Sequence, residues 1–197
     1  MTNLARFRHF VAETSRAVEA SHVDEAHLLA TLTPLLVDLV ALDDWLPAAY
    51  AAPHPHFYQQ YLLYGDPLDR WSVVSFVWGP GQQTPVHDHT VWGLVGVLRG
   101  AEISTGFAQA SGGRLTARPP ERIEAGTVVA VSPTIGDVHM IANAHADRTS
   151  ISIHVYGGNI GRIRRHVFDA ATGAAKPFIS GYSNSTIPNL WPADEAA

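Results

Sequence analysis

Apolar positions in the first quarter of the chain recur at the three- and four-residue intervals of amphipathic helices. The clearest stripe consists of leucines set among polar residues: Leu28, Leu29, Leu32, Leu35, Leu36 and Leu39. Thr33 and Pro34 have the pattern of an N-cap followed by a first-turn proline, so we predict one helix that ends near Leu32 and another that begins there. Several prolines after residue 46 indicate turns, around a short helix predicted over residues 57–63.

From residue 71 onwards the pattern changes to short runs rich in β-branched and aromatic residues, separated by glycine, proline and aspartate. These runs are WSVVSFVW (71–78), VWGLVGVLR (91–99), EISTGFAQ (102–109), TVVAVS (127–132), SISIHVY (150–156) and RIRRHVF (162–168). Their spacing of about ten residues is typical of an all-β barrel or sandwich. No internal repeat, low-complexity tract or interdomain linker is visible.

We therefore predict one domain over residues 1–197. It would have a mainly helical N-terminal flank (1–65), a β-barrel core (71–168) and a C-terminal extension (169–197). Hydrophobic residues make up 46% and charged residues 16% of the chain, which favours a globular protein with a substantial core.

The charge pattern bears on possible partners. The net charge of −5 comes without a cluster of Lys and Arg, so we expect neither nucleic acid nor an anionic membrane as a partner. No apolar run approaches the ~18 residues of a membrane span, and the opening MTNLARFRHF lacks the apolar core of a secretion signal. We therefore expect a cytoplasmic protein.

The chain has eleven histidines and no cysteine, which excludes disulfides, thiolate metal ligands and a cysteine nucleophile. A metal would therefore be held by histidine and carboxylate. His87 and His89 would project from one face of a strand and reach one ion, while Asp88 would point away. The alternative is a solvent-facing histidine pair beside a turn.

A second polar pattern lies in TSISIHVYGG, where alternation separates a polar face from the face of Ile151 and Ile153. This pattern also suits an exposed strand with one polar face. However, Ser152, His154 and Tyr156 in line are what a hydrogen-bond relay requires, because the serine hydroxyl orients the imidazole and the imidazole orients the tyrosine hydroxyl.

Residues around the histidine pair fit, in every spacing, the first motif of the cupin superfamily: Gly81, His87, His89 and Gly100. A further set resembles the second cupin motif, with one residue more in each of its first two gaps: Gly126, Pro133, Gly136, His139 and Asn143. The resemblance implies a mainly β fold, the cupin double-stranded β-helix or jelly-roll barrel, with a metal inside and N-terminal α-helices beside it. It also implies that His139 is the third metal ligand.

Gly93 occupies the position of the glutamate of the first cupin motif, so the predicted ligand set has no carboxylate. Three neutral imidazoles leave up to three open positions on an octahedral ion and suit Fe, Ni, Cu or Zn better than Mg or Ca. His145 lacks such placement. We expect five further histidines on the surface or in structural hydrogen bonds: His9, His22, His27, His54 and His56.

A Ser-x-His-x-Tyr strand after a three-histidine cupin site resembles the thiol dioxygenases, the family of cysteine dioxygenase and of bacterial 3-mercaptopropionate dioxygenase, which is the nearer of the two. By this resemblance His87, His89 and His139 bind Fe(II), and Ser152, His154 and Tyr156 form the outer-sphere triad. The reaction implied is addition of both atoms of O2 to a small thiol, giving a sulfinic acid. Animal cysteine dioxygenases have, at the position of Gly93, a cysteine crosslinked to the tyrosine, and this chain cannot form that crosslink.

The expected substrate depends on Gln60 and Arg165. Gln60 aligns with the carboxylate-binding arginine of cysteine dioxygenases, whereas the 3-mercaptopropionate enzymes resemble this chain in having glutamine. Arg165 interrupts the apolar face of Ile163 and Val167, either to bind a substrate carboxylate or to pair with an internal acid. We expect 3-mercaptopropionate first and mercaptosuccinate second. The alternatives are a cysteine dioxygenase, another metal-dependent cupin enzyme, or a small-ligand-binding or regulatory cupin.

Overall fold

The structure is a computed structural model that describes residues 3–21, 24–110 and 113–191. Its helical elements are α1 (Leu4–Ala20), α2 (Glu25–Val40) and the short 3-10 helices η1 (Ala48–Tyr50) and η2 (Ile160–Arg162). Its strands are β1 (Gln59–Gly65), β2 (Ser72–Trp78), β3 (Val86–His87), β4 (Gly93–Arg99), β5 (Ala101–Gln109), β6 (Leu115–Ala117), β7 (Glu121–Glu124), β8 (Val128–Val131), β9 (His139–Asn143), β10 (Ser150–Tyr156), β11 (Arg165–Phe168) and β12 (Ala175–Phe178).

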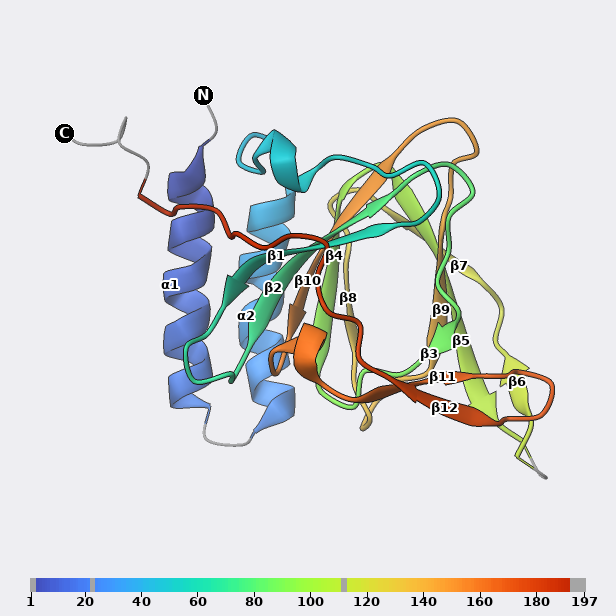
Figure 1. The fold of residues 1–197 in the computed structure, drawn as a ribbon. Coiled ribbons are helices and arrows are strands. Elements are labelled where there is room, and N and C mark those ends of the chain that lie inside the picture. Colours follow the sequence, from blue (N-terminus) through green and yellow to red (C-terminus); the bar gives the residue numbers. More distant parts are fainter. Residues whose placement is uncertain (1–2, 22–23, 111–112, 192–197) are drawn as a thin grey trace.

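The strands form two facing antiparallel sheets, with α1 and α2 packed side by side on the outer face of one of them (Figure 1). The first sheet has the order β1-β2-β10-β4-β8, and the second has the order β12-β11-β3-β9-β5-β6, with β7 also paired to β5. This mainly β architecture is the double-stranded β-helix barrel that the sequence predicts. Neither helix among the described residues has the length and apolarity that crossing a bilayer requires.

The helices cover the barrel through a close approach at Gly96 of β4. A Cβ atom at this position would lie 3.0 Å from both Leu36 Cγ and Val40 Cγ1, so only glycine lets α2 pack this closely. Phe7 of α1 stacks on Trp45 at 5.0 Å between ring centroids, which closes the outer layer of the core. Because helices cover one side and the barrel interior the other, every residue of β2 and β10 is buried.

The helix break predicted at Pro34 is wrong, because α2 runs without interruption from Glu25 to Val40. Its N-cap is Asp24, whose carboxylate accepts a hydrogen bond from the His27 N–H at 3.0 Å. Pro34 lies on the exposed side of the helix, where water can bind the carbonyl group that the proline leaves unpaired. The buried leucines on both sides of it then hold the helix together.

The helix predicted over residues 57–63 is also wrong, because most of this segment is the edge strand β1. Strand β1 pairs with β2 on one side, and on the other the C-terminal segment runs back along it towards α1 (Figure 1). The Ser183 N–H donates to the Gln60 carbonyl at 2.8 Å, and the Leu62 N–H donates to Asn184 Oδ1 at 2.8 Å. These partners lie far away in sequence, so local propensity does not reveal them.

Candidate metal centre

Three histidines converge inside the barrel. His87 ends β3, His89 follows two residues later, and His139 begins β9, where it pairs with His87 across the ladder. One nitrogen of each ring lies within 4.8 Å of the others, and all three side chains are buried. The alternation argument therefore places His87 and His89 together as predicted, although only His87 is in a strand. Such a group can hold one metal ion.

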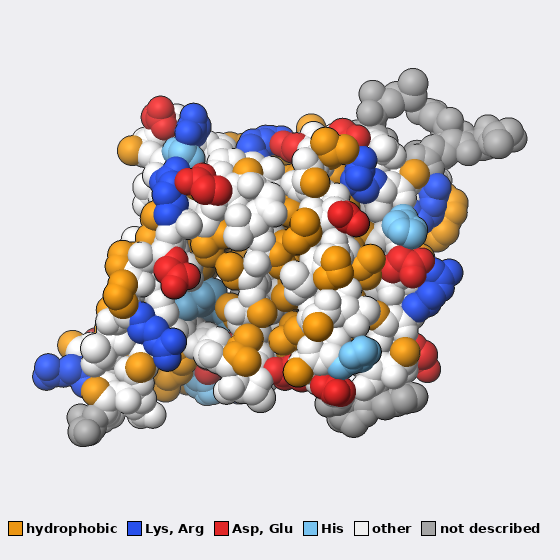
Figure 2. All heavy atoms as spheres, turned by 180° about the vertical axis from the view of Figure 1, so that it is seen from behind, with side chains coloured by type: hydrophobic (Ala, Val, Ile, Leu, Met, Phe, Trp, Pro, Cys, Tyr) orange, Lys and Arg blue, Asp and Glu red, His pale blue; other side chains and the backbone are white. Residues whose placement is uncertain are grey.

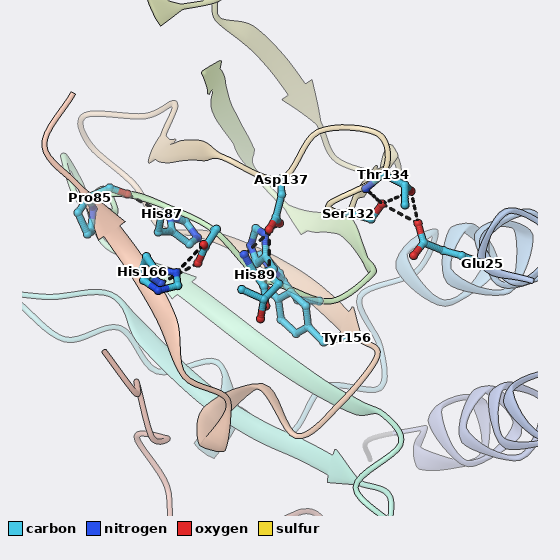
Figure 3. Close-up of polar contacts among 12 residues, drawn as sticks. Glu25, Pro85, His87, His89, Ser132, Thr134, Asp137, Tyr156 and His166 are labelled. Atoms are coloured by element: carbon cyan, nitrogen blue, oxygen red, sulfur yellow. Dashed lines mark hydrogen bonds and ion pairs between the residues drawn. The ribbon is translucent and has the colours of Figure 1, made fainter. Parts of the chain in front are cut away.

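Asp137 orients one of these imidazoles (Figure 3). Its Oδ1 lies 2.8 Å from His89 Nδ1, and its two oxygens accept hydrogen bonds from the backbone N–H groups of His89 and Thr90. Burial alone would raise the pKa of Asp137, but these hydrogen bonds bring it below its usual value. The opposite nitrogen of the same ring, His89 Nε2, is buried and has no partner among the described residues. A metal ligand is held in this way.

His87 and His139 are held in the neutral form that binds metals. Burial, together with the nearby His89, lowers the pKa of His87 to about 3. Burial, together with the nearby His89, His87 and His154, lowers the pKa of His139 well below its usual value. His87 Nδ1 lies 3.1 Å from the Pro85 carbonyl, which leaves its Nε2 for an ion. A neutral ring such as that of His87, with one nitrogen held and one available, fits a transition metal such as iron or zinc.

The relay predicted on β10 is present. Ser152 Oγ lies 2.8 Å from His154 Nε2, and His154 Nδ1 lies 2.7 Å from the Tyr156 hydroxyl. The Trp78 indole N–H donates to Ser152 Oγ at 3.2 Å. β10 lies between β2 and β4 and is buried along its whole length, so the alternative of an exposed strand with one polar face is wrong.

The relay ends beside the three-histidine group. The Tyr156 ring stacks on His89 with 5.4 Å between ring centroids. Gly93 also lies against this ring, and a Cβ atom at position 93 would be only 3.0 Å from Tyr156 Cδ1. Gly93 therefore leaves room for the tyrosine rather than supplying a ligand. Among the described residues, the candidate metal-binding group contains histidines alone.

A cavity of about 220 Å³ opens beside His87, and its walls include both predicted substrate-binding residues, Gln60 and Arg165. Arg165 is 3% exposed, and no carboxylate lies within 4.0 Å of its guanidinium in the described part of the chain. Its Nη2 donates to Ser180 Oγ at 2.8 Å, and its Nε has no hydrogen-bond partner among the residues described. Among the described residues, Arg165 therefore shows no internal ion pair.

Gln60 and Arg165 meet through a third residue, Ser180, which sequence reasoning did not identify. Gln60 Nε2 donates to Ser180 Oγ at 3.0 Å and to the Gly181 carbonyl at 2.8 Å. The Arg165 guanidinium carbon lies 4.7 Å from the centroid of the Phe178 ring. The C-terminal extension therefore forms one wall of the cavity.

Asp88 and the other histidines that the structure describes do not belong to the three-histidine group. Asp88 is not part of the three-histidine group, and its Oδ2 lies 2.9 Å from His166 Nδ1. The other histidines lie elsewhere: His9, His27 and His56 are exposed, His54 and His145 are partly buried, and His22 is outside the described residues. On the face in Figure 2, Lys and Arg lie mostly near the margins among acidic side chains, so its described residues form no basic patch.

Residues 46–169 match the family model described as cysteine dioxygenase type I. The chain belongs to the cysteine dioxygenase type I family. This membership supports a thiol dioxygenase, and it includes both the three histidines and the β10 relay within the matched residues.

Solved structures are also similar to this family member, at low identity. A Klebsiella pneumoniae protein with a double-stranded β-helix domain is 22% identical, with a TM-score of 0.43, over 58% of this chain and 89% of that one. A cupin superfamily protein from Desulfitobacterium hafniense is 15% identical, with a TM-score of 0.45, over 60% and 94%. Oxalate oxidase in complex with glycolate is 18% identical, with a TM-score of 0.43, over 55% of each chain.

Proposed function

We propose that this member of the cysteine dioxygenase type I family is an iron-dependent dioxygenase of small thiol carboxylates. The reaction is R–SH + O2 → R–SO2H, in which sulfur is oxidised and both oxygen atoms are retained in the sulfinic acid. Fe(II), held by His87, His89 and His139, would supply the redox chemistry that couples O2 to the thiol. The observation that carries the proposal is the position of Tyr156, stacked on His89 at the end of the relay.

The chain's own residues would position the reactants. The buried Tyr156 hydroxyl, with a pKa raised by burial above its usual value, keeps its proton and can donate a hydrogen bond beside the metal. His154 and Ser152 hold that hydroxyl in place through the relay. The barrel excludes water, because every member of the relay is at most 3% exposed.

The cavity supports a substrate that carries a carboxylate. Burial lowers the pKa of Arg165, and an incoming carboxylate would supply the counter-charge that the guanidinium lacks. Ser180 Oγ already accepts hydrogen bonds from Arg165 and Gln60, so its own hydroxyl proton is left to donate to the same carboxylate.

The same cavity favours an acid without an α-amine. The residues that line it contain no aspartate or glutamate to pair with an ammonium group: Tyr58, Gln60, Phe76, Thr84, Pro85, His87, Arg165, Val167, Phe178 and Ser180. We therefore propose 3-mercaptopropionate as the preferred thiol, mercaptosuccinate second, and both ahead of cysteine.

The test is oxygen uptake by iron-loaded protein with 3-mercaptopropionate, mercaptosuccinate, cysteine and cysteamine, with the products identified by mass spectrometry. We expect one O2 consumed per thiol and a product that has gained two oxygen atoms. Zinc-loaded protein is the matched control and should consume none. Absence of uptake with every thiol would favour a different cupin enzyme or a ligand-binding cupin, and cysteine as the best substrate would favour a cysteine dioxygenase.

A further inference from the structure

Glu102 is a buried acid inside the barrel that the proposed reaction does not use. It is 0% exposed, and neither carboxyl oxygen has a hydrogen-bond partner among the described residues. Along β5 its side chain shares a face with Ser104 and Gly106, which line a cavity that also reaches His139. The Ser152 hydroxyl and the Trp78 indole are the polar groups that influence the pKa of this carboxyl. Neither of them forms a hydrogen bond of good geometry with it.

No cationic side chain pairs with this carboxyl in the part of the chain that the structure describes. On β9 its ladder partner is Asn143, whose side-chain amide bonds backbone carbonyls and Ser150, and on β7 its partner is the apolar Ile123. Arg122 and Glu124 flank Ile123, but they are exposed and pair with each other at 2.6 Å. Burial therefore dominates and raises the pKa of Glu102 to about 7. Below neutral pH the group is a protonated hydrogen-bond donor.

The number of donors that bond to Ser152 decides which atom donates and which accepts in each hydrogen bond of the relay. A serine hydroxyl has one hydrogen and two acceptor sites, and the Trp78 N–H already uses one acceptor site. His154 is neutral, because burial keeps its pKa well below the usual value, so one of its nitrogens donates and the other accepts. Which nitrogen carries the hydrogen depends on whether Ser152 donates to His154 or accepts from it.

A donor at the second acceptor site of Ser152 settles this choice. With both acceptor sites occupied, Ser152 must donate to His154 Nε2, and His154 Nδ1–H then donates to the Tyr156 oxygen. The tyrosine hydrogen is thereby free to point towards the metal centre. With an ionised carboxylate in that place, Ser152 donates to the acid instead, the histidine tautomer reverses, and Tyr156 donates back to His154.

We propose that Glu102 is a positioning residue whose protonated carboxyl donates to Ser152 and so directs the Tyr156 hydroxyl towards the metal centre. Its effect on turnover rests on the proposed thiol dioxygenase function, but the direction of the relay does not. Ionisation of Glu102 would reverse the relay, so the carboxyl acts as a pH-dependent switch on the orientation of Tyr156.

The decisive measurement is the tautomer of His154, observed by 15N NMR on the full-length protein loaded with diamagnetic Zn(II). Spectra would be taken at about pH 6 and about pH 8, on either side of the Glu102 pKa of about 7. We expect the Nδ1–H tautomer at the lower pH and the Nε2–H tautomer at the higher pH. Infrared spectra should show a protonated-carboxyl band that disappears over the same range.

The matched variants are Glu102→Gln and Glu121→Gln. The Glu102→Gln amide can donate to Ser152 at every pH, whereas Glu121→Gln alters an exposed carboxyl on β7, the strand that pairs with β5. Glu102→Gln should keep the Nδ1–H tautomer at both pH values and lose the infrared band, whereas Glu121→Gln should behave like the wild type. In the iron-loaded protein kcat should fall by about 10²-fold at the higher pH, the usual effect of losing one oriented hydrogen bond, and Glu102→Gln should remove that fall.

A His154 tautomer that is the same at both pH values in the wild type would overturn the proposal, as would a pH-dependent tautomer that persists in Glu102→Gln. The wild-type NMR and infrared titrations decide the question even where the variant does not fold. A tautomer switch without any thiol oxidation would support the role of Glu102 and reject the proposed function. Thiol oxidation with a fixed tautomer would support the proposed function and reject the role of Glu102.

Discussion

Gly93 lies against the ring of Tyr156, and a Cβ atom on the glycine would be 3.0 Å from Tyr156 Cδ1 and 3.1 Å from Val131 Cγ2. The position where the cupin motif has a glutamate therefore serves here to seat the tyrosine. Among the described residues, the all-histidine candidate ligand group and the placement of the relay both follow from a glycine at this one position. Larger side chains at position 93 must displace the tyrosine ring, whose hydroxyl lies 2.7 Å from His154 Nδ1.

We predict that Gly93→Ala destabilises the protein by about 1–3 kcal/mol, the usual range for overpacking a close-packed core. The displaced ring should also disturb the relay, so turnover should fall while metal content stays normal. Urea unfolding and oxygen uptake would measure the two effects. Gly126→Ala is a useful contrast, because its Cβ would meet no atom within 4 Å although its φ of 85° is strained. Stability and turnover unchanged in Gly93→Ala would contradict the predicted crowding.

We predict that the protein binds about one iron per chain and that His139→Ala removes most of it, together with the activity. The reason is that three neutral imidazoles form the whole candidate ligand set, so one loss leaves only two. Metal analysis after loading and desalting gives the measurement. His9→Ala, which changes an exposed histidine of α1, is the control and should bind iron normally. Normal iron content in His139→Ala would remove it from the ligand set.

Much of this centre is predictable from sequence, because its signals are local. Period-two alternation places His87 with His89 and aligns Ser152, His154 and Tyr156, and the structure brings both sets together inside the barrel. Alternation alone does not tell a solvent-facing polar strand from one that faces a barrel interior. That distinction depends on the covering helices and the opposite sheet, which are tertiary features.

The parts that sequence reasoning missed are those whose partners are remote. Asp137 stands two residues before His139, which is a signal that could have identified it, but its partner His89 is far away in sequence. In the sequence Glu102 has the pattern of an ordinary polar strand position, because its burial depends on the remote strands β9 and β10. Ser180 lies in the C-terminal extension and meets Gln60 only because that segment returns along β1. Pro34 misled the helix prediction because its ring faces solvent.

We predict that Tyr156→Phe slows turnover by about 10²-fold and leaves iron bound, since the change removes one oriented hydrogen bond at the reacting centre and no ligand. Steady-state oxygen uptake and metal analysis on the same sample test both parts. Tyr61→Phe removes a hydroxyl that bonds the Ala52 carbonyl on the protein surface and should leave the rate unchanged. Equal kcat and kcat/KM in wild type and Tyr156→Phe would show that the relay has no role in the reaction.

We predict that Arg165→Met weakens kcat/KM for 3-mercaptopropionate by about 2–5 kcal/mol, the usual loss when one member of a buried charged pair is removed. Cysteamine has no carboxylate, so its kcat/KM should change far less. Arg164→Met, which changes the exposed neighbour, should affect neither substrate. Equal losses for both thiols would mean that Arg165 supports the cavity wall without binding the carboxylate, and the substrate assignment would then fail.

The buried acid also predicts how stability depends on pH. Burial raises the pKa of Glu102 from 4.5 to about 7, so between these pH values the folded protein keeps a proton that the unfolded chain has released. The stability that this group contributes is therefore fully present below about pH 4.5 and is lost as pH rises through about 7. A difference of this size corresponds to about 3 kcal/mol in the free energy of unfolding.

We predict that Glu102→Gln does not lose this unfolding free energy as pH rises, because glutamine cannot titrate. Urea unfolding of the metal-free proteins at a series of pH values gives the test, because the histidines and other titrating groups cancel in the difference between variant and wild type. The difference should grow in favour of the variant from about pH 4.5 to about pH 7 and then level off. Glu121→Gln, with an exposed carboxyl, should run parallel to the wild type. Parallel curves for Glu102→Gln would mean that the acid is ionised in the folded protein and cannot donate to Ser152.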